Sequence, residues 1–354
     1  SRNVVEIAKI ARQLAAVENI VVGGKVLPAR EAIMYPNSCI LWDRGAFEKA
    51  AALFLAYLHA GIPVDVLSEQ DVIDGSAKDY ALLFVVGANI RKEALSALNA
   101  YVTQGGTLVS SVPEVRNQFD EPIPDGAKVF GANGIKSLKN DVPPGGIGNT
   151  GAIPPLDTVS WAGKTIEIIA QKSAITPGPN AEILATFADG SPALVKAKKG
   201  TGTVYQYGFA PGLSYMRTDY GKNLRGVFPT ALARNDKERK LATLPSAGLP
   251  NVVKTSASMV SGRVTTNKDA SVVGLVDYGI GALGREHPNP AVRDVDFETL
   301  PAFDVVVEIS CKKPDSVTGV RSGELPWDHA DGKLTVKVPL RGVEMLILKG
   351  NALF

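Results

Sequence analysis

The chain has few of the side chains that enzymes use for nucleophilic catalysis. Its 354 residues include only two cysteines and three histidines. Cys39 and Cys311 stand in different segments, so we expect two small buried thiols rather than a disulfide. A nucleophilic serine or cysteine needs a neighbouring base, most often a histidine. Such a site would therefore have to be built from very few residues.

The sequence also lacks long apolar runs and an excess of charge of either sign. No stretch approaches the roughly 20 apolar residues that span a bilayer. With 38 basic and 36 acidic residues the formal net charge is +2, so nucleic acid and anionic membranes are not expected as partners. The N-terminus shows no signal-peptide pattern, and any leader would have been removed or would belong to a longer precursor. We expect a soluble protein that is either located in the bacterial cytoplasm or secreted.

What the chain does contain is a continuous α/β pattern. Continuous apolar strands alternate with helices that end at Gly61 and at the pair Gly105-Gly106. This alternation predicts a mainly parallel sheet with helices on both faces. The expected strands are Glu31–Tyr35, Pro63–Leu67, Ala81–Val86 and Thr107–Ser110, with helices that start near Ala46 and Arg91.

Ligands of open α/β sheets bind just beyond the carboxyl ends of the strands. Two of these ends read Gly87-Ala88-Asn89 and Ser110-Ser111-Val112-Pro113, and neither offers a thiol, a histidine or a Gly-x-Ser-x-Gly elbow. A scaffold that could hold a nucleophile shows none. The residues of a candidate binding crevice at this edge are Trp42, Asp43, Asn89, Ser111 and Glu114.

Other segments define the domain organisation. Val4–Val22 carries a helical apolar stripe, and residues 112–163 form an irregular, proline- and glycine-rich insertion that we expect on the surface. We predict an α/β domain at 1–248 and an antiparallel β-sandwich at 249–354. The strands expected after the insertion are Thr165–Ala170, Glu182–Phe187, Pro192–Ala197, Thr203–Gly208, Val252–Val260, Ala270–Tyr278, Phe303–Ser310, Val317–Arg321, Lys333–Val338 and Glu344–Leu348. Asp189-Gly190 is expected to join the second and third of these as a hairpin.

These segments resemble the non-catalytic C-terminal region of family 42 glycoside hydrolases and related β-galactosidase-like proteins. The resemblance is carried by LAAVENIVVGGKV, LHAGIPVDVLSEQDV, ALLFVVGANIRKEALSALNAYVTQGGTLV, FADGSPALVKAKKGTGTVYQYGFAPG and LTVKVPLRGVEMLIL. It implies a trimerisation domain with a class I glutamine-amidotransferase-like (flavodoxin-like) fold, followed by a small β-domain. It also implies a homo-oligomer, a trimer or a dimer, and a role in carbohydrate metabolism.

The chain departs from the catalytic parts of both families. It has no room for the eight-stranded barrel of about 250 residues that carries the glycosidase carboxylates, and it lacks the Asn-Glu dipeptide typical of the acid/base. Where the amidotransferase cysteine elbow would fall, the sequence reads Ser111-Val112-Pro113. The resemblance therefore implies a protein without glutaminase or β-galactosidase chemistry.

Other candidate sites have simpler explanations. Ser110 and Ser111 lack an evident base, because His59 lies in a helix and His287 and His329 in distant segments. The acidic residues Asp294, Asp296 and Glu298 alternate with apolar ones, as in an exposed edge strand. The glycine pairs, including Gly145-Gly146, match no phosphate-binding motif, and no calcium loop appears, so we expect no metal and no cofactor.

Three hypotheses remain. The first is an accessory or oligomerisation module of a glycoside hydrolase-like protein, with a catalytic barrel N-terminal to it or lost. The second is a stand-alone protein that binds a small ligand, such as a sugar, in the strand-end crevice; isolated tryptophans such as Trp42, Trp161 and Trp327 can stack on sugars but more often anchor cores. The third is a hydrolase with an unrecognised site.

Overall fold

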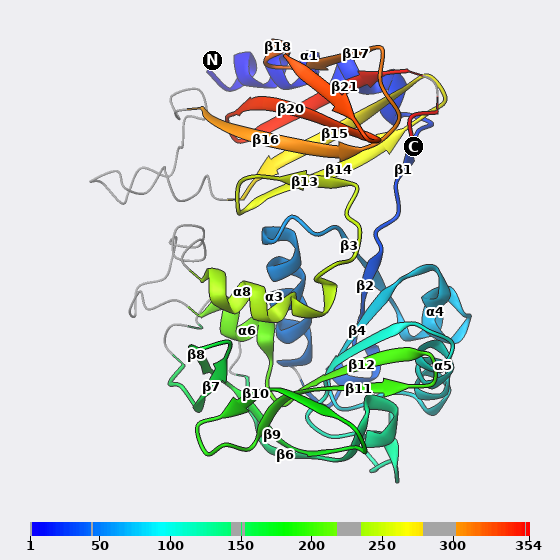
Figure 1. The fold of residues 1–354 in the computed structure, drawn as a ribbon, viewed down its shortest axis with the longest axis vertical. Helices are drawn as coiled ribbons and strands as arrows, with labels where there is room; N and C mark the ends of the chain where they lie inside the picture. Colours follow the sequence, from blue (N-terminus) through cyan, green and yellow to red (C-terminus); the bar gives the residue numbers. More distant parts are fainter. Residues whose placement is uncertain are drawn as a thin grey trace. The chain divides into compact units, whose positions relative to one another are not determined.

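The computed structural model describes residues 2–43, 45–142, 150, 153–217, 235–278, 302–350 and 352–354. The chain divides into two compact units (Figure 1). One, the α/β unit, contains residues 29–57 and 64–249, and the other, the β unit, contains residues 1–28, 58–63 and 250–354. Among the described helices, none is long and apolar enough to cross a membrane. His287, Asp294, Asp296, Glu298 and Gly145-Gly146, considered above, lie outside the described residues.

The α/β unit is built on a nine-stranded mixed sheet with the order β3-β2-β4-β5-β12-β11-β10-β7-β8. The pairs from β3 to β12 are all parallel, and the pairs from β12 to β8 are all antiparallel. The parallel strands are β2 (Glu31–Met34), β3 (Val64–Leu67), β4 (Leu82–Val86), β5 (Thr107–Ser111) and β12 (Gly202–Tyr207). The four predicted parallel strands are confirmed, but antiparallel strands extend the sheet, so it is mixed.

Helices cover both faces of the parallel strands. One face of the sheet is covered by α5 (Lys92–Thr103), which contributes Leu95 and Leu98 to a buried core. The same core contains alternate residues of β2 and β4, including Met34, Leu83 and Val85. On the opposite face, Ile33 of β2 lies beside α3 (Gly45–His59). The remaining helices of this unit are α2 (Asn37–Ile40), α4 (Glu69–Ile73), η1 (Ser76–Asp79), η2 (Gly126–Phe130), α6 (Pro211–Met216), α8 (Asp236–Ala242) and η4 (Leu244–Ser246).

The segment predicted as an irregular surface insertion contains regular structure. Residues 132–140 form β6 (Ala132–Asn140), which pairs antiparallel with β9 (Gln171–Pro177). The expectation of an irregular excursion was wrong for these residues, because pairing with a strand from the far side of the insertion overrides the local glycine content. The other antiparallel strands are β7 (Asp157–Trp161), β8 (Lys164–Ile168), β10 (Glu182–Phe187) and β11 (Pro192–Lys199). The hairpin at Asp189-Gly190 is confirmed, with Gly190 at φ 81°.

The β unit is a sandwich of a six-stranded and a four-stranded sheet. Their orders are β1-β14-β15-β21-β17-β18 and β13-β16-β20-β19. Both sheets contribute to one apolar core, which includes Val273 and Leu348 of the first and Val307 and Val336 of the second. The strands are β13 (Val253–Thr255), β14 (Val260–Thr266), β15 (Ala270–Asp277), β16 (Phe303–Ser310), β17 (Ser316–Gly319), β18 (Gly323–Glu324), β19 (Trp327–Ala330), β20 (Lys333–Leu340) and β21 (Val343–Lys349).

The N-terminal residues belong to the β unit, not to the α/β unit. The helix expected at Val4–Val22 is α1 (Arg2–Val21), which lies against β14 and β15. The strand β1 (Lys25–Val26) then pairs antiparallel with β14. The prediction of one domain over residues 1–248 therefore differs from the structure at its N-terminal end. The strand expected at Val252–Val260 is two strands, β13 and the start of β14, which lie in different sheets.

Candidate functional site

The candidate site is the edge of the sheet at which the parallel strands end. β2, β3, β4 and β5 all run in the same direction, so the loops that follow them meet at this edge. All five residues predicted from the sequence lie in these loops or, for Ser111, at the last position of β5. The structure places them in three separate environments, which we describe in turn.

Ser111, at the end of β5, lies inside the protein. Its side chain is 1% exposed, and its Oγ has no hydrogen-bond partner among the described residues. Gln171 of β9 donates from Nε2 to the Ser111 carbonyl at 2.9 Å, and Ser110 donates its hydroxyl to Gln206 of β12. The strand end where a nucleophile elbow would fall is therefore covered by side chains from two other strands.

Among the described residues, the unit that contains Ser111 holds no histidine that could act as its base. Of the three histidines, His59 and His329 belong to the β unit, and His287 lies outside the described residues. Cys39 follows β2, but it is buried, and burial is the main cause that raises the pKa of its thiol above the ordinary range. A Cβ at Gly87 would lie 2.7 Å from the Cys39 Sγ, which shows how closely the thiol is packed. The thiol thus has the environment of a structural cysteine.

Asn89 anchors the loop that follows β5. Its Nδ2 donates to the Asn117 carbonyl at 3.2 Å and to the Asp120 carboxylate at 2.9 Å. The backbone amide of Ile90 donates to the Arg116 carbonyl at 2.8 Å, and the Arg116 amide donates to the Ala88 carbonyl at 3.0 Å. The loop after β5 therefore continues the pairing of β4 and β5 beyond the sheet.

The loop is also stabilised by its own side chains. Asn117 accepts the amides of Phe119 and Glu121 on Oδ1, at 2.9 and 3.0 Å, and donates to the Glu121 carboxylate at 2.7 Å. Arg116 donates to Glu114 at 3.1 Å and to the Asp120 carbonyl at 2.6 Å. Glu114, one of the predicted residues, thus forms an ion pair, and its hydrogen bond raises the pKa of Arg116.

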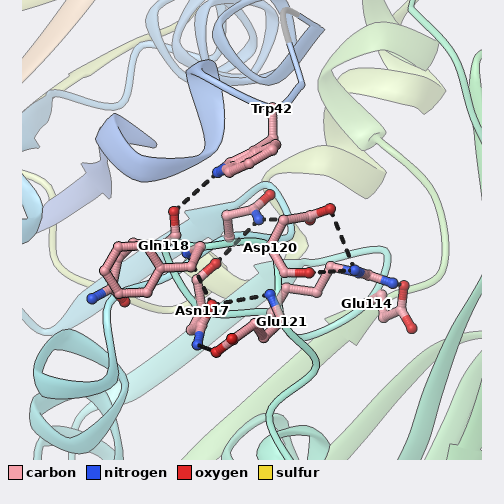
Figure 2. Close-up of polar contacts among 9 residues, drawn as sticks. Trp42, Glu114, Asn117, Gln118, Asp120 and Glu121 are labelled. Carbon is pink, nitrogen blue, oxygen red and sulfur yellow. Dashed lines mark hydrogen bonds and ion pairs between the residues drawn. The ribbon is translucent and has the colours of Figure 1, made fainter.

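Trp42 lies on the outer side of this loop. Its indole Nε1 donates to the Gln118 carbonyl at 3.0 Å (Figure 2), which satisfies its one polar group. The side chain is nevertheless 54% exposed, and Phe119 on the loop is 68% exposed. Two aromatic rings with open apolar surface are therefore present here: Phe119 in the loop and Trp42, which is bonded to it. The loop itself carries three carboxylates and one guanidinium.

Asp43 belongs to a different cluster. It accepts a hydrogen bond from the ammonium of Lys49 at 2.8 Å, from the amide of Asn140 at 3.0 Å and from the Gly45 backbone at 2.8 Å. The Lys49 side chain is 0% exposed and also donates to Asn140. Burial acts to raise the pKa of Asp43, but Lys49 and Asn140 outweigh it and hold this pKa below its usual value. A buried lysine paired with a half-buried aspartate is a structural arrangement.

Sequence reasoning missed the residue that joins three of the strand-end loops. Glu69 is 2% exposed and accepts from the backbone and hydroxyl of Ser38, at 3.0 and 2.9 Å. Arg91, after β4, forms an ion pair with the same carboxylate at 3.4 Å. The available signal was the Ser68-x-x-Asp71 capping box, which places Glu69 at the start of α4.

The described residues at this edge offer no evident catalytic pair. Ser111 and Cys39 are buried, and Asp43, Glu69 and Glu114 are each held by a cation. Within the described part of the chain, no group of three or more histidine, cysteine or acidic residues could hold a metal ion. What the site does present is two exposed rings, Trp42 and Phe119, and the polar loop to which Phe119 belongs.

Comparison with solved structures identifies the fold. No family model matches the sequence, and no curated protein matches it. A catalytic mutant of a GH42 β-galactosidase from G. stearothermophilus superposes with a TM-score of 0.64 at 17% identity, over 99% of this chain and 44% of that one. The chain has the fold of part of a GH42 β-galactosidase.

Two other solved structures agree with this result. The β-galactosidase from a Rahnella species has a TM-score of 0.61 at 17% identity, covering 99% of this chain and 45% of that one. The α-L-fucosidase isoenzyme 2 from Paenibacillus thiaminolyticus has a TM-score of 0.63 at 12% identity, covering 96% and 51%. The chain thus spans about half the length of the glycoside hydrolases whose fold it shares.

Proposed function

We propose that this chain is a non-catalytic accessory or oligomerisation module of a glycoside hydrolase-like, β-galactosidase-like protein. The observation that carries the proposal is the buried end of β5. In an amidotransferase-like sheet this position holds the nucleophile, and here Ser110 and Ser111 are enclosed by Gln171 and Gln206. A serine without access to solvent and without a base is not expected to react.

The strand order supports the flavodoxin-like part of the proposal. The five parallel strands follow one another in space as β3-β2-β4-β5-β12. Counted along the chain, this is the order 2-1-3-4-5, which is typical of flavodoxin-like doubly wound sheets. The class I amidotransferase-like fold expected from the resemblance is of this kind, and in our proposal the fold serves assembly.

We further propose that the α/β unit associates with other copies of itself as a trimer or a dimer. An apolar groove of about 260 Å³ lies at the edge strand β3, next to α3. Phe47 and Val66, which line it, are 48% and 52% exposed. An exposed apolar patch beside the edge strand of a sheet is typical of an interaction site. The groove is lined by Ile33, Tyr35, Phe47, Ala50, Ala51, Phe54 and Val66.

Activity assays test the non-catalytic role. We expect the purified chain to hydrolyse neither glutamine nor an aryl β-galactoside above the rate of a buffer blank. The proposal would be contradicted if the native chain turned over either substrate and the Ser111→Ala or Cys39→Ala variant did not. The inactive variant must keep the melting temperature of the native chain.

A second candidate function is binding of a carbohydrate at the strand-end site. Trp42 and Phe119 favour it, because open aromatic faces beside carboxylate and guanidinium groups are the surfaces on which sugars stack and form hydrogen bonds. Titration with galactose or lactose should then change the tryptophan fluorescence of the native chain. The change should disappear in Trp42→Ala and persist in Trp161→Phe. The absence of any response at millimolar sugar would exclude this function for these two sugars.

A further inference from the structure

The chain contains a single Asn-Gly dipeptide, Asn133-Gly134, and the structure places it at an irregular point of β6. Ala132 pairs with Pro177 of β9, and the next pair joins Gly134 to Thr176. Asn133 is therefore an extra residue without a partner, as in a β-bulge, where the regular ladder is interrupted. Its side chain is exposed, and its Nδ2 donates to the Pro177 carbonyl at 3.2 Å.

The backbone around this dipeptide is less restrained than that of a strand inside a sheet. β6 and β9 form a sheet of two strands, so one edge of β6 has no neighbouring strand. Gly134 has no Cβ beside its backbone nitrogen and restricts the backbone least of all residues. By contrast, Asn89 and Asn117 at the strand-end site are 3% and 2% exposed, and neither precedes a glycine.

We propose that Asn133 is a site of spontaneous deamidation, which converts it to aspartate and isoaspartate. A base in the solvent removes the proton of the Gly134 backbone nitrogen, and this nitrogen attacks Cγ of the Asn133 side chain. The bond from Cγ to Nδ2 breaks, and the nitrogen takes up a proton and leaves as ammonia. Water then opens the succinimide ring at either of its two carbonyl carbons. No oxidant or reductant takes part, and asparagine is among the thermolabile residues of proteins.

The two products change the strand in different ways. Aspartate replaces the Nδ2 donor with a carboxylate, which then lies against the Pro177 carbonyl without a hydrogen bond. Isoaspartate leads the backbone through the side-chain Cβ and so lengthens β6 between Ala132 and Ile135. These two residues are 1% and 9% exposed and belong to the apolar core of the α/β unit. The longer backbone shifts one of them from its place, which weakens the pairing with β9.

The experiment incubates the folded native chain at mildly alkaline pH and follows each asparagine by peptide mass spectrometry, with fragmentation that distinguishes aspartate from isoaspartate. Asn180 is the internal control, because it is exposed and is followed by Ala181. We expect Asn133 to convert several-fold faster than Asn180. Gly134→Ala should slow the conversion of Asn133 several-fold, because the added Cβ crowds the attacking nitrogen. That variant should keep the native melting temperature, since the Cβ would meet its nearest atom at 3.5 Å.

Three results would overturn parts of this inference. An Asn133 that converts no faster than Asn180, or equally fast in the native chain and in Gly134→Ala, rejects the site. A rate that does not rise with pH rejects the mechanism, because the attacking nitrogen must lose its proton. Asn133→Asp carries the new charge without the longer backbone. Hydrogen exchange in β9 should be faster in the aged native chain than in this variant, and equal exchange rejects the displacement of β6.

Discussion

At the residue scale, several charged side chains lie where burial dominates their behaviour. Glu31, at the start of β2, is 5% exposed. Burial raises its pKa to about 7, against a smaller opposing effect from Arg30 and from nearby backbone amides. Such a group connects stability to pH within the neutral range.

Glu31 should make the α/β unit less stable as the pH rises from 4.5 to 7. The unfolded chain releases this proton near pH 4.5, whereas the folded chain holds it until about pH 7, so folding favours the protonated form. The loss over this window is on the order of 3 kcal/mol. Urea unfolding of the native chain and of Glu31→Gln between pH 4 and 8 measures it. The variant should gain relative stability as the pH rises, and parallel pH curves for the two proteins would contradict the prediction.

Lys49 should be costly to remove alone and less costly to remove with its partner. Lys49→Met leaves Asp43 and Asn140 without their common donor, and we expect a loss of about 3 kcal/mol in the free energy of unfolding. In Asp43→Asn/Lys49→Met no unpaired charge is left, so the double variant should be more stable than Lys49→Met. Denaturant titration checks the cycle. Strictly additive losses would show that the two side chains do not act as a pair.

At the scale of elements, close backbone approach positions the helices of the α/β unit. Gly212 in α6 lies against the backbone of α3, and a Cβ there would come within 2.4 Å of the Leu53 amide nitrogen. Because backbone atoms cannot move aside as a side chain can, only glycine fits at this crossing.

Gly212→Ala should therefore destabilise the protein by about 2 kcal/mol or more. Gly134 in β6 is a suitable control, since a Cβ there would meet its nearest atom at an ordinary 3.5 Å. We expect Gly134→Ala to retain the native melting temperature in a thermal scan. Equal losses in the two variants would attribute the effect to glycine replacement in general and not to the crossing of α6 and α3.

At the scale of the whole molecule, the two units have separate apolar cores. Leu348 is 0% exposed in the core of the β sandwich. Leu348→Ala should cost about 2–5 kcal/mol in that unit. Hydrogen exchange should consequently become faster in β16 and β20 and remain near native in β4 and β5. Equally faster exchange in both sets of strands would show that the units open together.

The sequence by itself determined most of the helices and strands. Continuous apolar strands between capped helices predicted the parallel strands β2 to β5, and short strands spaced by turns predicted the sandwich. The lack of a thiol or a histidine in the segments directly after β4 and β5 could be read from the sequence, because it depends only on residue types. Trp42, Asn89 and Glu114 were found from their positions after strands or near the sheet edge.

Only the tertiary structure decided how distant segments combine. β6 pairs with β9, and β1 pairs with β14. The local sequence of a strand does not determine which other strand it pairs with. The buried partners of Ser110 and Ser111 come from β9 and β12, far along the chain, and Glu69 meets Ser38 and Arg91 in the same way. Periodicity predicted that α1 has an apolar stripe, but not that the stripe faces outward, because which side of a helix is covered depends on what packs against it.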